Sequence, residues 1–146
     1  HTGEKRALAA ISLATMIICA VGVFIDISVI TVAPIALAIG KKAGYHKEAL
    51  LLAMIGGGKA GNIISPNPNT IAVSEAFKVD LTSLMMKNFI PAICAVVVTI
   101  LLSTMLSKKQ GVQVTENDLE QKEDKNLPSF IQAVAGPVVA VMMYVI

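Results

Sequence analysis

An apolar run from Ala7 to Gly40 constrains this chain more than any other feature, because its 34 residues contain a single charge, Asp26. A continuous helix of that length would be about 51 Å long at about 1.5 Å per residue, whereas the hydrocarbon core of a bilayer is about 30 Å thick. The run is therefore too long for one membrane span and short for two full ones. Three interpretations remain: a tilted span with an extension, two short spans, or a re-entrant hairpin of two half-helices.

The composition favours the membrane. Hydrophobic residues make up 55% of the chain and charged residues 15%, and the mean hydropathy is +0.72. Ordinary soluble domains carry roughly 25% charged residues. These values argue against a disordered chain, a nucleic-acid binder and a typical cytosolic enzyme. Cys19 and Cys94 have no metal-ligand spacing, and we expect neither a metal site nor a cofactor.

Basic residues flank the first run on both sides. They are Lys5, Arg6, Lys41, Lys42 and Lys47. Cytoplasmic flanks of membrane spans are enriched in Lys and Arg, so both ends of the run are expected on the cytoplasmic side. A re-entrant hairpin over residues 7–40, or a pair of short spans, meets that condition, and a single span does not. The tip is predicted near Gly22–Asp26.

The second apolar run, residues 49–77, is interrupted. The interruption contains four glycines and two prolines, namely Gly56, Gly57, Gly58, Gly61, Pro66 and Pro68. Such a sequence predicts a broken helix, because these residues are poor in helix interiors. Gly57 and Gly61 also have the spacing typical of close helix packing. Non-helical backbone at membrane depth is tolerated where it lines a polar cavity, and it indicates a transporter binding site.

The rest of the chain completes a polytopic pattern. Residues 89–106 are uncharged and predict a spanning helix, residues 107–128 a cytoplasmic linker with a solvated acidic face, and residues 129–146 the start of the next span. The fold class expected is an all-α polytopic membrane protein of the inner or plasma membrane. A first residue other than Met and an apolar end suggest an internal fragment of a longer protein.

Polar side chains gather around the interruption and are the candidate substrate ligands. They are Lys59, Asn62, Ser65, Asn67, Asn69 and Thr70. Carbonyl groups there would suit a cation, and the N-terminus of the next helix would suit an anion. The alternative is an ordinary surface turn with Asx-type caps. Lys59 has three interpretations of equal weight: pairing with a substrate carboxylate, pairing with Asp26, or reaching to the surface.

Asp26 is the candidate coupling residue. A carboxylate at membrane depth costs about 2.5–3.5 kcal/mol on insertion scales, so it is rare without a partner or a function. One interpretation is a proton or cation site. The alternative is an N-cap of a helix over residues 27–39, and the two interpretations are compatible.

A family resemblance follows from two stretches. Residues 24–35, FIDISVITVAPI, resemble the F-[FL]-D-[VI]-x-x-[VI]-x-x-x-P-[IL] stretch of gluconate permeases of the GntP type, which are proton symporters of sugar acids. Residues 65–70, SPNPNT, are similar to the proline-rich break of that family, often P-P-H-P-G-P. Asp26 and Pro34 match the first motif, and Pro66 and Pro68 match the second. The resemblance covers about residues 5–106.

The resemblance implies part of an N-terminal transporter repeat over residues 1–106, built from a hairpin, a broken helix and a spanning helix. It implies a small carboxylate substrate that is moved together with protons, or alternatively with Na⁺. The protein is expected to contact membrane lipid and not to bind nucleic acid, and a homo-oligomer is one possible assembly. Asn67 stands where the family has histidine, so an organic-anion transporter is favoured over gluconate specifically. The rivals are a cation:proton antiporter of the same superfamily and a non-transporting membrane scaffold.

Overall fold

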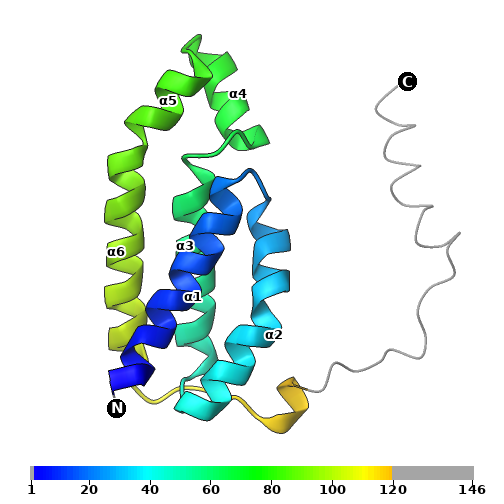
Figure 1. Cartoon of the computed structure of the whole chain (residues 1–146), viewed down its shortest axis with the longest axis vertical. Coiled ribbons are helices and arrows are strands. Elements are labelled where there is room, and N and C mark those ends of the chain that lie inside the picture. The colour runs from blue at the N-terminus through cyan, green and yellow to red at the C-terminus, as the bar shows by residue number, and fades with distance from the viewer. Residues whose placement is uncertain (1, 120–146) are drawn as a thin grey trace, which may run out of the picture.

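The computed structural model describes residues 2–119, which form helices and contain no β-strand (Figure 1). The elements are α1 (Thr2–Ala20), α2 (Ile25–Ala43), α3 (Lys47–Asn62), α4 (Pro68–Phe77), α5 (Leu81–Lys87), α6 (Phe89–Leu106) and a 3-10 turn, η1 (Glu116–Asp118). The expected all-α class is confirmed for this part of the chain. The span predicted over residues 129–146 lies outside the described residues.

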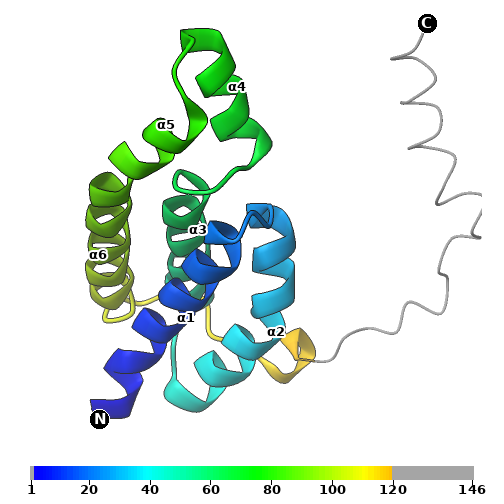
Figure 2. The ribbon, with the colours of Figure 1, turned by 45° about the horizontal axis from the view of Figure 1, so that its top comes forward.

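Four helices, α1, α2, α3 and α6, run side by side as a bundle, and α3 contacts the other three (Figures 1 and 2). The end of the bundle that holds the start of α1 and the α2–α3 connection is called the base here. At the opposite end α4 and α5 form a helical hairpin that projects beyond the bundle. The α1–α2 turn and the end of α3 therefore lie at the same end, next to α4.

The first apolar run folds as two antiparallel helices rather than one tilted helix. α1 ends at Ala20 and α2 begins at Ile25, so the turn falls at the predicted tip. Gly22 takes a φ of +107° there, a conformation that glycine adopts without strain. Each helix has 19 residues, about 28 Å at about 1.5 Å per residue. Whether the pair spans a bilayer or re-enters it stays a prediction.

The prediction that the four glycines break the second helix is wrong. α3 runs without interruption through Gly56, Gly57, Gly58 and Gly61, and the break is confined to residues 63–67. The glycines fit because α3 is enclosed on three sides. A Cβ atom would strike Thr99 of α6 at Gly56, Ser12 of α1 at Gly57 and Ile25 of α2 at Gly58. Close packing on three neighbours thus outweighs a propensity cost of about 1 kcal/mol per glycine.

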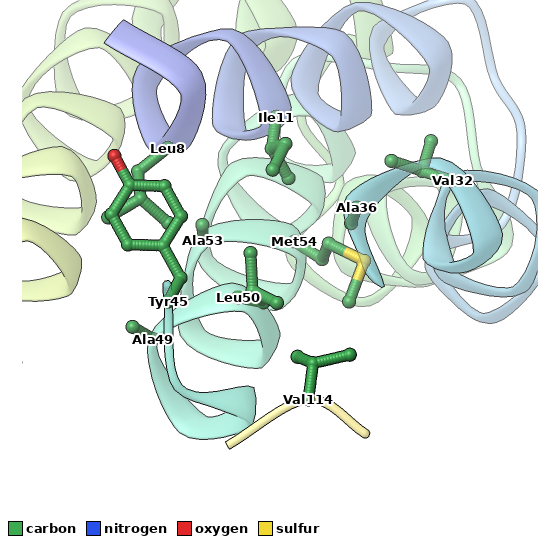
Figure 3. Close-up of a cluster of buried hydrophobic side chains, with 10 residues drawn as sticks. All are labelled: Leu8, Ile11, Val32, Ala36, Tyr45, Ala49, Leu50, Ala53, Met54 and Val114. Carbon is green, nitrogen blue, oxygen red and sulfur yellow. The ribbon is translucent and has the colours of Figure 1, made fainter. Parts of the chain in front are cut away.

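The apolar core lies between α1, α2 and α3 in the half of the bundle near the base (Figure 3). Its buried members are Leu8, Ile11, Val32, Ala36, Tyr45, Ala49, Leu50, Ala53, Met54 and Val114. The outward faces of the bundle are apolar as well. Exposed examples are Ile17, Ile30, Ile35, Ile90, Val98 and Leu101. In residues 2–119, α6 is the one helix long and apolar enough to cross a membrane.

Residues 107–119 pack against the base, and we call them the base strap. The Lys47 N–H donates to the Val112 carbonyl at 2.9 Å, and Val114 is buried in the core. Ion pairs of 2.7 Å join Lys41 to Glu116 and Lys47 to Asp118. The hydrogen bond from Lys47 lowers the pKa of Asp118 to about 2. The predicted linker is therefore docked rather than free over its described part.

Candidate functional site

The break between α3 and α4 is closed by side chains of its own residues. The carbonyl of Asn62, at the end of α3, accepts hydrogen bonds from Ser65 Oγ at 3.1 Å and from Thr70 Oγ1 at 3.2 Å. The Asn67 Nδ2 group also donates to this carbonyl, and it donates to Ser65 Oγ at 2.9 Å. Ser65, Asn67 and Thr70 are all buried. The break is thus an ordered corner with its polar groups turned inward.

Asn67 is the N-cap of α4. Its Oδ1 atom accepts hydrogen bonds from the backbone N–H groups of Asn69 at 2.9 Å and Thr70 at 3.3 Å. Pro68, the first residue of α4, has no N–H group. The first donors of the helix are therefore already used, and the expectation that they face an anion is not met. The Asx-cap alternative describes Asn67 correctly, although the cap is buried rather than on the surface.

The carbonyl groups of the break are also engaged by protein donors. The Ser65 carbonyl accepts the Asn67 N–H at 2.9 Å, and the Ile63 carbonyl accepts Asn88 Nδ2 at 3.2 Å. With the Asn62 carbonyl, this accounts for three carbonyl oxygens around the corner. Each of these three carbonyl oxygens already accepts at least one hydrogen bond from the protein, which leaves fewer lone pairs for a cation.

A pocket of about 170 Å³ adjoins the break. Its lining residues are Lys59, Asn62, Ile63, Asn67, Asn69, Thr70, Val73 and Asn88. Five of the six predicted ligands line it, and the sixth, Ser65, lies behind it against Asn67. Sequence reasoning missed Asn88, which closes the corner between α5 and α6. Its position just before an uncharged run was the available signal.

Asp26 lines a second pocket, of about 340 Å³. Its other lining residues are Ile25, Val29, Ile30, Ile55 and Lys59. Lys59 therefore borders both pockets. No ion pair joins it to Asp26 among the described residues. Asp26 is the second residue of α2, and the N-cap position belongs to Phe24, so the N-cap alternative for Asp26 is wrong.

Asn62 differs from the other buried polar residues at the break. It is 4% exposed, and its Oδ1 atom is buried without a hydrogen-bond partner among residues 2–119. Its neighbours Ser65, Asn67 and Thr70 all have side-chain partners within the corner. Buried amides without partners are rare in folded proteins, because the amide loses its bonds to water.

The chemistry of the first pocket is one cation among neutral amides. Lys59 is the charged residue of its lining, and four asparagines and a threonine supply donors and acceptors. A lysine ammonium complements one carboxylate, and amides complement hydroxyl groups. The pocket therefore offers groups that complement a carboxylate and hydroxyl groups, beside the apolar side chains of Ile63 and Val73.

Comparison with known proteins places the chain in a family. The sequence matches the GntP family permease over residues 1–146, and the chain belongs to this family. A protein of Haemophilus influenzae named as an uncharacterized transporter is 52% identical over 141 residues, which cover 97% of this chain and 33% of the relative. The chain thus spans about a third of the length of this curated relative. No solved structure matches it.

Proposed function

We propose that this chain is part of a longer multi-pass permease of the inner or plasma membrane. The permease would be a secondary active transporter that takes up gluconate, or a related sugar acid or hydroxy acid, together with protons. Membership of the GntP permease family supports transport, as does the 52% identity to a protein named as a transporter. The apolar outward faces of the bundle support a lipid environment, since soluble proteins rarely expose such surfaces.

The distribution of basic residues supports the orientation. Arg6, Lys41, Lys42, Lys47, Lys108 and Lys109 all belong to the base or its strap. Lys78 and Lys87 belong to the α4–α5 hairpin at the opposite end. Because cytoplasmic flanks are enriched in Lys and Arg, the base is proposed to face the cytoplasm.

The pocket at the α3–α4 break carries the proposal for the substrate. Lys59 would bind the carboxylate, and the amides of Asn69 and Asn88 would bind hydroxyl groups at the rim. Asn67, Ser65 and Thr70 would hold the shape of the corner, since their side chains already bond to one another and to Asn62.

The position of Lys59 between two pockets supports a way to couple protons to the anion. An ionised Asp26 would attract the Lys59 ammonium toward the second pocket and away from the substrate. A proton on Asp26 removes that competition, so Lys59 becomes available to the carboxylate. Proton binding and anion binding would then favour each other. In the state with neither proton nor substrate bound, the charges of Asp26 and Lys59 would neutralise each other.

Uptake of radiolabelled gluconate by cells that express the full-length permease tests this function. We expect accumulation that rises as the external pH falls and that collapses when a protonophore is added. The Asp26→Asn variant, which carries no titratable group there, is expected to lose the pH dependence. Uptake that ignores the protonophore would contradict proton symport.

Two further outcomes would replace the proposal. If Na⁺ collapses a proton gradient in vesicles and gluconate does not, the protein is a cation:proton antiporter. If neither solute is moved, and the wild type takes up none of the tested acids, the chain belongs to a membrane scaffold.

A further inference from the structure

We infer that Asn62 selects hydroxylated substrates, because its carboxamide is positioned to bind a substrate hydroxyl group while Lys59 binds the carboxylate. This inference rests on the proposed function. It assigns to one residue the discrimination between a hydroxy acid and a simple carboxylic acid.

The observation that carries the inference is an unpartnered amide at the pocket wall. Asn62 lines the pocket, is 4% exposed, and its Oδ1 atom has no hydrogen-bond donor among residues 2–119. The nearby Asn67 and Asn88 side chains both donate to protein carbonyls. Of the two buried amides of the wall, Asn62 and Asn67, Asn62 is the one whose side chain is left for a ligand.

A hydroxyl group satisfies this amide better than any other group of a small acid. The carboxamide offers an oxygen that accepts and a nitrogen that donates, and a hydroxyl group both donates and accepts. The fit therefore does not depend on which way the amide is turned. An ionised carboxylate only accepts, so it can pair with the Nδ2 group but not with Oδ1, and the ammonium of Lys59, which only donates, complements it better.

The positions of the two residues suit a single small ligand. Lys59 and Asn62 are three residues apart on α3, so they share one face of the helix, with Cβ atoms about 5–6 Å apart. Both line the same pocket. A hydroxy acid of a few carbon atoms can therefore reach Lys59 with its carboxylate and Asn62 with a hydroxyl group.

A competition experiment on the full-length permease tests the selectivity. Unlabelled gluconate and unlabelled hexanoate, which has the same number of carbon atoms and no hydroxyl groups, compete with radiolabelled gluconate. In the wild type, gluconate should compete at least about tenfold better than hexanoate, because a buried polar group is left unpaired by the apolar acid. Asn62→Leu should reduce that ratio by about tenfold. Asn117→Leu, the same change on the strap, should leave it unchanged.

Thermal unfolding of the purified full-length protein separates this role from a structural one. Because Leu replaces an amide without a partner, ligand-free Asn62→Leu should unfold at the wild-type temperature or higher. Gluconate should raise the unfolding temperature of the wild type and raise that of the variant much less. Asn67→Leu, which removes the α4 cap, should unfold at a lower temperature.

The outcomes are distinguishable. If the wild type takes up no hydroxy acid, the proposed function fails. If the wild type transports gluconate and Asn62→Leu keeps the full selectivity, the inference alone is overturned. The inference is also overturned by a loss of stability at this position. That result would be that Asn62→Leu and Asn62→Ser both unfold at a lower temperature than the wild type without ligand, or that both fail to reach the membrane, because Asn62 would then bond to another part of the protein.

Discussion

Gly57 offers the sharpest test of how the bundle holds the site. An alanine Cβ there would lie 2.5 Å from Thr15 Oγ1 and 2.7 Å from the carbonyl carbon of Ser12. Non-bonded carbon contacts are about 3.5–4.0 Å, so α1 would have to retreat by about 1 Å. The obstacle is backbone and cannot rotate away. Overpacking of this kind costs up to about 3 kcal/mol, and the better helix propensity of alanine returns about 1 kcal/mol. We expect Gly57→Ala to destabilise the bundle by about 2 kcal/mol.

The buried thiol of Cys19 reports this change directly. Cys19 lies in α1 against the same face of α3, whereas Cys94 is exposed. In full-length protein with every other cysteine replaced by serine, Cys19 alkylation should begin at a lower temperature in Gly57→Ala than in the parent. Gly40→Ala is the matched control, because its Cβ meets the side chain of Leu50, which can adjust, and its shift should be smaller. An unchanged or raised alkylation temperature in Gly57→Ala would refute the three-sided packing of α3.

Two further predictions concern the corner and the strap. Asn67→Ala should lower stability by about 1–2 kcal/mol in thermal unfolding, because α4 loses its cap, while gluconate affinity at permissive temperature changes little; a selective loss of affinity would instead mean that Asn67 touches substrate. The pKa of Asp118 is lowered from 3.8 to about 2, so its contribution is present above about pH 4 and is lost as the pH falls toward 2. Hydrogen exchange at the backbone N–H of Lys47, corrected for the intrinsic exchange rate, should therefore become faster as the pH falls through that interval. At neutral pH it should be faster in Asp118→Asn than in the wild type. Equal exchange rates under all these conditions would contradict the docking of the base strap.

Local patterns in the sequence predicted the parts of the fold that depend on neighbouring residues along the chain. The turn after Ala20 follows from a run too long for one helix, with a glycine at its middle. The range of α6 coincides with the uncharged run over residues 89–106. The corner at Pro66 and Pro68 follows from the loss of two backbone donors.

Features that depend on tertiary contacts could not be predicted from the sequence. Glycine propensity alone predicts a break at Gly56–Gly58, but three neighbouring helices occupy the space that side chains would need. The acidic residues Glu116 and Asp118 look solvated in sequence, and the fold brings Lys41 and Lys47 to them across more than 70 positions. The same holds for the site. Proximity along the chain grouped Lys59 with Asn62 and Asn67, but only the fold adds Asn88 and shows which amide lacks a partner.

The central claim is that Lys59 binds the substrate carboxylate at the α3–α4 break. Equilibrium binding of radiolabelled gluconate to the purified full-length permease tests it most directly, with Lys59→Met, Lys59→Arg and, as a control at the base, Lys108→Met. A hydrogen bond to a charged group contributes about 1.5–3 kcal/mol, so Lys59→Met should weaken binding by about tenfold or more. Lys59→Arg should keep part of the affinity, and Lys108→Met should bind as the wild type does. Wild-type affinity in Lys59→Met would contradict the account.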